Sequence, residues 1–183
     1  MPKVGKIKVT QEKLSQTINL KEVFGQSFSG QKALKEAIAQ ALIDKIVERT
    51  ESGIAVTGKK LKAPYSKAYT KTLEFKAAGK RKNKVNMTLT GDMLRSIDVI
   101  GDSANTITIG IDEEDEAAKA FNHQVGDTVP KRPFFGLTNK DVDAVKKEFK
   151  ADLDKAFKKR GDSRGNAVEA ILLKLLRSTD GEG

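Results

Sequence analysis

Few residues of this 183-residue chain have the types and spacing needed for chemistry, and the first to test is a phosphate-loop pattern. Gly53–Lys59 reads GIAVTGK and fits G-x-x-x-x-G-K, a motif whose backbone N–H groups cradle phosphates. The motif continues with Ser or Thr, which holds magnesium, but this chain has Lys60. A phosphate loop also follows a buried strand, whereas a helical pattern precedes Gly53 in this chain. We therefore interpret the stretch as a glycine-bounded loop.

One histidine and one acidic run are the remaining chemical candidates. His123 is the only histidine and the chain has no cysteine, which excludes disulfides, thiolate metal sites and histidine-rich metal sites. No serine or carboxylate pair stands beside His123 as in a catalytic triad, so a packed or hydrogen-bonded helix histidine is favoured. The run DEEDE at 112–116 lacks the glycine and the twelve-residue spacing of a calcium loop. We expect no enzyme, no cofactor and no metal.

Charge is segregated along the chain, which has a net charge of +9. Residues 51–91 carry ten basic and two acidic side chains, and residues 92–127 carry two and nine. One basic face is typical of nucleic-acid binders, whereas opposite charges on two faces are typical of self-assembling subunits. Ordinary solvated surface is the third interpretation, because exposed ion pairs contribute little. No apolar run is long enough for a membrane span or a signal peptide, so we expect a protein that stays where it is made.

Hydrophobic periodicity predicts the elements that must position these residues. The clearest helix covers residues 30–51, where apolar residues follow the three-and-four spacing of one face and Gly53 ends the helix. Residues 97–111 predict a two-stranded antiparallel hairpin with GDSAN as its turn. Thr138 and Asp141 form a capping-box variant before a helix whose apolar face is Val142, Val145, Phe149 and Leu153.

Shorter patterns lie between these elements. We expect a short helix after Pro64, an exposed loop over GKRKNK at 79–84, and a helix begun by Thr90 as its N-cap, with Met93, Leu94 and Ile97 on one side. Residues 112–126 predict a short helix with its carboxylates in the first turn, where the helix dipole favours them.

These elements together predict an α+β fold of amphipathic helices packed on a small, mostly antiparallel sheet. Residues 1–29 alternate weakly and predict an N-terminal extension with one or two short strands. The main domain is expected over 30–161, and residues 162–183 form a C-terminal extension with a final helix and tail.

Residues 130–138, PKRPFFGLT, hold two of the four prolines and two of the eight phenylalanines. Pro130 and Pro133 favour an extended backbone, in which neighbouring side chains face opposite ways. We therefore expect one of Phe134 and Phe135 to enter the core and the other to meet a neighbouring subunit, with Arg132 free to meet a carboxylate. The alternative is that both rings are buried, one on each side of a covered sheet.

The same segment resembles a known protein family. RPFFGLTNKDVDAV is similar to the arginine-proline-phenylalanine-hydrophobic-glycine-leucine segment of the phage virion morphogenesis, or tail-completion, proteins, where it precedes a C-terminal helix. Three further segments resemble the family in the same order: ERTESGIAVTGKKLKAPYSKAYTK, LTGDMLRSI and AAKAFNHQVG. The likeness covers about residues 30–157. The chain departs from the family in lacking a tryptophan after the first helix.

The resemblance implies a structural virion protein without a membrane role, a ring-forming neck or tail-completion subunit that finishes the tail and joins it to the head. It implies a sixfold or twelvefold ring, assembled in the host cytoplasm, that touches portal or adaptor proteins and tail tube or tail terminator proteins. Contact with packaged DNA stays open.

A cyclic ring needs two different faces on each subunit, and the oppositely charged segments are candidates for them. The candidate assembly residues are Arg132, Phe134, Phe135, Asp112, Glu113, Glu114, Asp115, Lys80, Arg81, Lys82 and Lys84. The alternative function is a basic nucleic-acid-binding module, in which Lys59–Lys84 follows phosphates.

Overall fold

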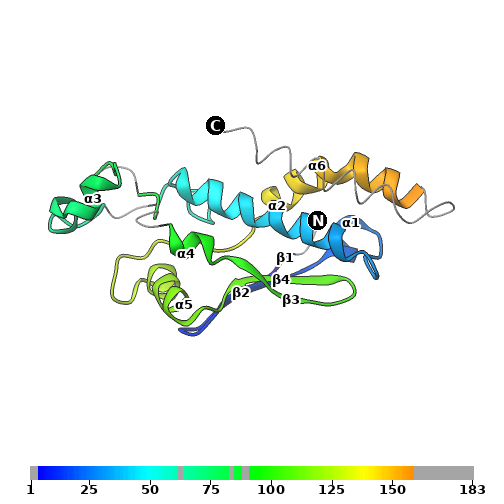
Figure 1. Cartoon of the computed structure of the whole chain (residues 1–183), viewed down its shortest axis with the longest axis horizontal. Coiled ribbons are helices and arrows are strands. Elements are labelled where there is room, and N and C mark those ends of the chain that lie inside the picture. Colours follow the sequence, from blue (N-terminus) through cyan, green and yellow to red (C-terminus); the bar gives the residue numbers. More distant parts are fainter. Residues whose placement is uncertain (1–3, 62–63, 83–84, 88–90, 159–183) are drawn as a thin grey trace.

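A four-stranded antiparallel sheet and a set of helices form the fold, in a computed structural model that describes residues 4–61, 64–82, 85–87 and 91–158 (Figure 1). The strand order in the sheet is β1-β2-β4-β3, and every neighbouring pair is antiparallel. The strands are β1 (Val4–Val9), β2 (Leu14–Asn19), β3 (Asp98–Asp102) and β4 (Thr106–Ile111). The predicted α+β class and the predicted hairpin are confirmed.

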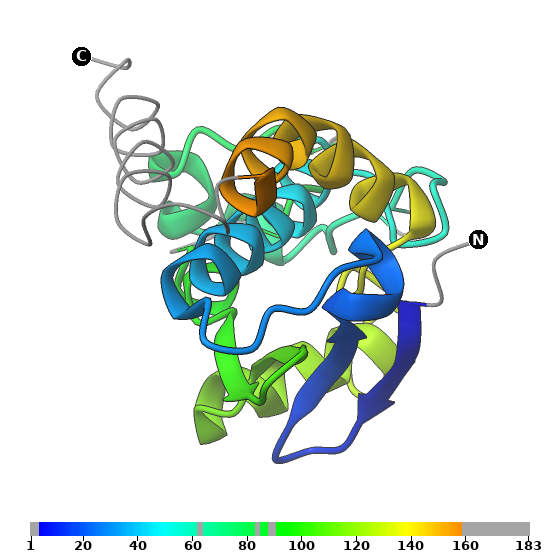
Figure 2. The same ribbon diagram turned by 90° about the vertical axis from the view of Figure 1, so that its right-hand side faces the viewer.

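The helices lie mainly on one side of the sheet. They are α1 (Leu20–Phe24), α2 (Lys32–Glu51), α3 (Leu73–Ala77), α4 (Asp92–Arg95), α5 (Glu114–Phe121) and α6 (Asn139–Lys158), with a 3-10 turn η1 (Tyr69–Lys71) and a π-helical turn η2 (Asn122–Gly126). Figures 1 and 2 agree that α2 lies between the sheet and α6. α3 lies apart, at one end of the long axis (Figure 1).

The two central strands bury one face, because their side chains alternate. Ile18 on β2 pairs with Ile107 on β4, and Leu14 pairs with Ile111, all of them buried. The intervening Thr17 pairs with Thr108, and their hydroxyl oxygens lie 2.9 Å apart in a hydrogen bond on the opposite face. This alternation is typical of an antiparallel sheet with one covered face.

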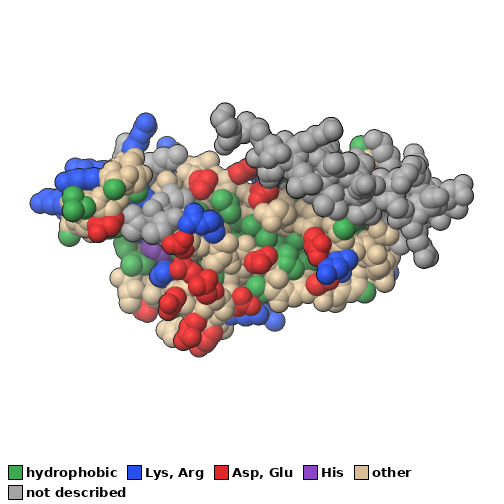
Figure 3. Space-filling view, viewed as in Figure 1, with side chains coloured by type: hydrophobic (Ala, Val, Ile, Leu, Met, Phe, Trp, Pro, Cys, Tyr) green, Lys and Arg blue, Asp and Glu red, His purple; other side chains and the backbone are tan. Residues whose placement is uncertain are grey.

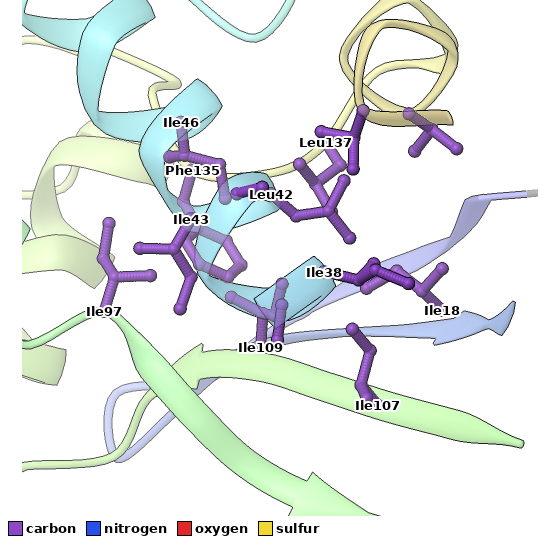
Figure 4. Packing of buried hydrophobic residues seen from close by; sticks show 14 of the residues in the cluster. Ile18, Ile38, Leu42, Ile43, Ile46, Ile97, Ile107, Ile109, Phe135 and Leu137 are labelled. Carbon is purple, nitrogen blue, oxygen red and sulfur yellow. The ribbon is translucent and has the colours of Figure 1, made fainter. Parts of the chain in front are cut away.

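Helix α2 is the centre of the core. It buries side chains on more than the one face that the spacing predicts, because the sheet covers one side and α6 another. Figure 4 shows Ile38, Leu42 and Ile46 of α2 among the sheet residues Ile18 and Ile109. The buried set of α2 also includes Lys35, whose ammonium pairs with Asp102 at the end of β3 and donates to the Ser103 carbonyl at 2.7 Å.

The N-terminal residues belong to this sheet. Residues 1–29 were expected to form an extension, but β2 pairs with β1 on one side and β4 on the other, and Leu14 and Ile18 are fully buried. The strands exist as predicted, yet they are part of the domain rather than an extension of it. The buried side chains of β2 belong to the same hydrophobic core as those of α2.

The predicted start of the helix at 91–97 lies partly outside the described residues. Thr90 is one of those residues, and in the described part Gly91 is the N-cap of α4, with a φ of 86° that favours glycine. Met93, Leu94 and Ile97 are buried together, as the pattern predicts.

The phosphate-loop look-alike is a loop in the structure. It follows α2 rather than a strand, and a single antiparallel bridge pairs Ile54 with Lys60. The glycines at its two ends, Gly53 and Gly58, have φ values of 77° and 76°. The predicted glycine-bounded loop is confirmed.

Candidate functional site

Residues 64–82 form a small basic lobe with its own aromatic cluster. Tyr65 and Tyr69 each pack edge to face with Phe75 and are tilted against each other, with ring centroids 5.2–5.3 Å apart. The local sequence supports this cluster, because the Thr72 hydroxyl caps α3, the helix that carries the buried Phe75, by accepting from the Phe75 N–H at 3.2 Å. Six basic side chains and one acidic side chain give the lobe a net charge of +5. Figure 3 shows Lys and Arg gathered at this end.

Two cations lie over the Tyr65 ring. The Lys80 ammonium is 4.9 Å from the ring centroid and 3.3 Å from the phenol oxygen, and the Arg132 guanidinium is 5.3 Å from the centroid. Arg132 is only 5% exposed. The expectation of a free Arg132 is therefore wrong: a guanidinium is weakly hydrated and planar, so it stacks on an aromatic ring at low cost. Burial lowers the pKa of Arg132, and the two tyrosines oppose this shift.

His123 and Glu116 line the same cavity as these two cations. The His123 carbonyl, in the π-helical turn, accepts the Arg132 N–H at 2.7 Å and ties the turn to the proline-bracketed segment. Glu116 is buried, and one of its oxygens accepts from Lys119 at 2.5 Å. Its other oxygen, Oε2, and the His123 Nδ1 are both buried and have no hydrogen-bond partner in the part of the chain described. The site is thus polar but incompletely paired.

Acidification is expected to destabilise the protein through His123. Burial is the main cause that lowers the pKa of this imidazole from 6.5 to about 4, and the charges of Arg132 and Lys80 add to it. Between these two pH values the unfolded chain binds a proton that the folded chain does not, so stability falls as the pH falls through this window. We expect a loss on the order of 2 kcal/mol, because the open site lets solvent screen part of the charge.

Urea unfolding between pH 7 and pH 4 measures this loss. The matched variant is His123→Gln, which keeps a polar side chain but cannot titrate. Between pH 7 and pH 4 this variant should lose less stability than the unsubstituted chain, and the difference should equal the loss that is expected from His123. Identical pH profiles for the two proteins would show that the imidazole plays no part.

A cavity of about 640 Å³ opens between the basic lobe and the body. Its lining draws on all four segments that resemble the tail-completion family. Tyr65 and Tyr69 come from the first segment, Met93 from the second, His123 from the third and Arg132 from the fourth. Segments that lie far apart in the sequence therefore meet at one place, which we call the aromatic pocket.

The proline-bracketed segment, residues 130–138, runs from this pocket into the core. Phe134 and Phe135 both have zero exposure, with ring centroids 6.4 Å apart. The prediction that one ring meets a neighbouring subunit is therefore wrong. The alternative is correct in that both rings are buried, but the segment is not a strand of a covered sheet. Figure 4 shows Phe135 beside Ile43 and Ile46 of α2.

Side chains rather than strands satisfy the backbone of this segment. Gln124 donates to the Phe135 carbonyl at 3.2 Å and accepts the Phe135 N–H at 3.1 Å. Arg49 donates to the Phe134 carbonyl at 3.0 Å and to the Gly136 carbonyl at 2.6 Å. These partners allow an extended chain to lie in the core without sheet pairing, because buried backbone groups need hydrogen bonds.

Two further residues complete the route of the segment. Gln16 of β2 accepts the Leu137 N–H at 2.7 Å and donates to the Gly5 carbonyl at 2.7 Å, beside the bulge in β1. Gly136 has a φ of 125°, and a side chain there would collide with Ile7 of β1. The capping box that follows is confirmed: Thr138 and Asp141 exchange backbone and side-chain hydrogen bonds of 2.7–3.2 Å.

The charged assembly candidates occupy two surfaces that flank the aromatic pocket. Asp112, Glu113, Glu114 and Asp115 are all exposed, at the start of α5 (Figure 3). On the other side Arg81 and Lys82 are exposed, Lys80 is half-buried against the tyrosines, and Lys84 lies outside the described residues. Glu116, next to the acidic group in sequence, and Lys80 of the basic group both line the aromatic pocket, so the pocket lies between the two chain segments.

Sequence reasoning missed the residues that hold the buried segment. Gln16 occupies an inward position between Leu14 and Ile18, and a polar residue at that place in the alternation is the signal that was available. Arg49 follows the buried Ile46 by three residues, so it lies on the core side of α2. Neither pattern predicts which group the side chain bonds, because the partners in the buried segment lie more than 80 residues away along the chain.

Comparison with protein-family models, with curated proteins and with solved structures found no match. Within the described part of the chain, no helix has the length and apolar character of a membrane span.

Proposed function

We propose that this chain is a structural subunit of a tailed-phage virion, which completes the head-proximal end of the tail and joins tail to head as a ring of identical copies. The convergence of the four resembling segments on the aromatic pocket carries this proposal. The segments are separate in sequence, yet Tyr65, Met93, His123 and Arg132 line one cavity. A shared site gives the ordered likeness a common physical basis, since residues that pack together constrain one another.

The surface supports assembly with other chains. Among the described residues the exposed large apolar side chains are Leu73, at 79%, and Val125, at 39%. Leu73 lies in the basic lobe, and Val125 follows the acidic start of α5. An apolar point within a charged surround is typical of a protein interface, in which the rim is polar and the centre is dry.

The second candidate is a basic nucleic-acid-binding module, which the net charge of +5 on residues 64–82 favours. Single strands are bound by stacking bases on open aromatic rings beside a basic groove. Here Tyr65 already has Lys80 and Arg132 over its ring and two aromatic rings at its edges. This arrangement of Tyr65 therefore supports binding to phosphates more than base stacking. The nucleic-acid-binding function ranks below the assembly proposal for this reason.

The ring proposal predicts a defined oligomer and a defined loss of particles. Native mass spectrometry at moderate salt, with and without the neighbouring tail proteins, should show a closed ring. A phage from which the gene is cleanly deleted should produce unjoined heads and tails or defective tails, visible by negative-stain microscopy. Normal infectious particles from the deletion would refute the proposal.

Gel shifts on duplex DNA distinguish the second candidate. A nucleic-acid module loses affinity steeply as salt rises, because each neutralised phosphate releases counterions. A ring subunit keeps its protein contacts at moderate salt. Tight, strongly salt-dependent DNA binding by a monomer would favour the module over the ring.

A further inference from the structure

The aromatic pocket has the features of a site that is completed by a ligand. We propose that it docks a peptide segment of another protein, one in which a carboxylate side chain neighbours a large apolar side chain. The pocket residues themselves carry the chemistry of the ligand, whereas the choice of a different chain over a second copy rests on the proposed function.

The charged residues of the pocket lining indicate the charge of the ligand. The pocket is lined by three cations, Lys80, Lys119 and Arg132, and by one carboxylate, Glu116, which Lys119 already holds. The Arg132 guanidinium is only 5% exposed and lies against the Tyr65 ring, so its positive charge is held at a fixed place in the lining. An anionic group is therefore the complement of this lining, and the surrounding basic lobe attracts it over a longer range.

The apolar residues of the pocket lining indicate that the ligand also carries a large apolar side chain. Met87, Met93 and Val129 line the pocket together with Pro64 and Pro130. Methionine side chains adapt to the shape of what they contact, which suits a pocket that accepts a large aliphatic or aromatic side chain. The volume of about 640 Å³ lies within the usual range of ligand pockets.

Two unpaired polar atoms indicate a peptide rather than a simple anion. Glu116 is 7% exposed, and its Oε2 has no hydrogen-bond partner among the described residues; the same is true of the His123 Nδ1. A carboxylate oxygen needs a donor, and a neutral imidazole nitrogen takes a donor or an acceptor according to its tautomer. A peptide supplies both groups from its backbone, alongside a carboxylate for the cations.

The partner is a different chain rather than a second copy. Helix α5 supplies pocket residues Glu116 and Lys119 and begins with the acidic residues that directly precede them, so the acidic run of this chain cannot turn into its own pocket. In a second copy the acidic run likewise directly precedes the pocket residues of that copy. If each of two copies placed its acidic run in the pocket of the other, the two would form a closed two-fold dimer, whereas the proposed ring requires two distinct faces on each subunit.

The test uses a property of the composition. The chain has two tyrosines and no tryptophan, and both tyrosines line the pocket, so tyrosine emission reports this site alone. The probe is an acetylated and amidated nonapeptide of alternating acidic and large apolar residues, built from Glu, Asp, Leu and Phe. We expect a saturable change in emission with a Kd below about 1 mM. Control peptides with Gln for the acids, or Ser for the apolar residues, should bind at least roughly tenfold more weakly.

Two matched variants separate the pocket from general charge attraction. Lys80→Glu reverses a charge that lines the pocket, and Lys67→Glu makes the same change on an exposed lysine of the same lobe outside the lining. Lys80→Glu should weaken peptide binding roughly tenfold or more, and Lys67→Glu less than about twofold. Equal weakening by both variants would overturn the proposal, as would the absence of saturable binding to the unsubstituted chain.

Two outcomes distinguish this inference from the proposed function. Ring formation without peptide binding would overturn the docking site and leave the ring standing. A concentration-dependent change in tyrosine emission without peptide, abolished when Asp112 and Asp115 are both replaced by Asn, would show that a second copy occupies the pocket and would overturn the assignment to another chain.

Discussion

Replacing Phe135 with alanine is expected to lower the free energy of unfolding by roughly 3–5 kcal/mol, and replacing Phe134 is expected to lower it by a similar amount. Both rings are fully buried, so each truncation leaves a cavity as well as removing apolar surface from the core. The extended backbone places neighbouring rings on opposite sides, and here both sides are covered.

Urea unfolding of the two single variants measures this effect. Leu73→Ala is the control, because it also truncates a large apolar side chain but one that is 79% exposed. It should change stability by no more than about 0.5 kcal/mol. If either phenylalanine variant were as stable as the control, its ring would not belong to the core.

Arg49→Met is expected to destabilise the protein by roughly 3–5 kcal/mol, although methionine fills much of the same space. Arg49 pairs with Asp141 at 2.5 Å, and both side chains are largely buried. It also donates to the carbonyls of Phe134 and Gly136. The substitution leaves two buried carbonyls without their donor and removes the cation beside the Asp141 carboxylate, to which, among the described residues, only Thr138 then donates. The penalty for such groups exceeds the gain from an apolar side chain.

The charge on Arg49 is part of this role. Burial lowers the pKa of its guanidinium, and the charge and hydrogen bond of Asp141 oppose that shift, so the guanidinium stays charged. Lys45→Met is the matched control, since Lys45 lies one turn earlier on α2 and pairs with Glu48, whose side chain is exposed. It should cost less than about 1 kcal/mol.

A double-mutant cycle then isolates the pair. Asp141→Asn keeps a capping side chain but removes the negative charge, and the coupling between it and Arg49→Met should be about 1 kcal/mol or more for contacting buried groups. Additive losses in the double variant would show that the ion pair does not couple α6 to α2.

Local sequence alone determined the elements whose stability depends on near neighbours. The spacing of Leu34, Ile38 and Leu42 predicts the core side of α2, and these three residues are buried there. The capping box of Thr138 and Asp141 spans only three residues, so its hydrogen bonds follow from local geometry and are found as predicted. The β3–β4 hairpin likewise depends on alternation and a short turn.

The candidate site was predictable only in part, because its contacts join distant segments. The sequence singled out Arg132 and Lys80, but it placed them at open interfaces. Only the fold brings both over the Tyr65 ring and places His123 in the same pocket lining. The interaction of a cation with a ring leaves no periodic trace in sequence, since it depends on where two loops meet in space.

The fate of Phe134 and Phe135 was decided by tertiary structure for the same reason. Proline and alternation determine that the segment is extended and that its two rings point apart. Whether the second side meets solvent or protein depends on what packs there, and the hydrogen-bond partners that make burial possible are Arg49 and Gln124. Short-range patterns specify the shape of a segment, whereas its burial is set by partners that only the folded chain brings within hydrogen-bonding distance.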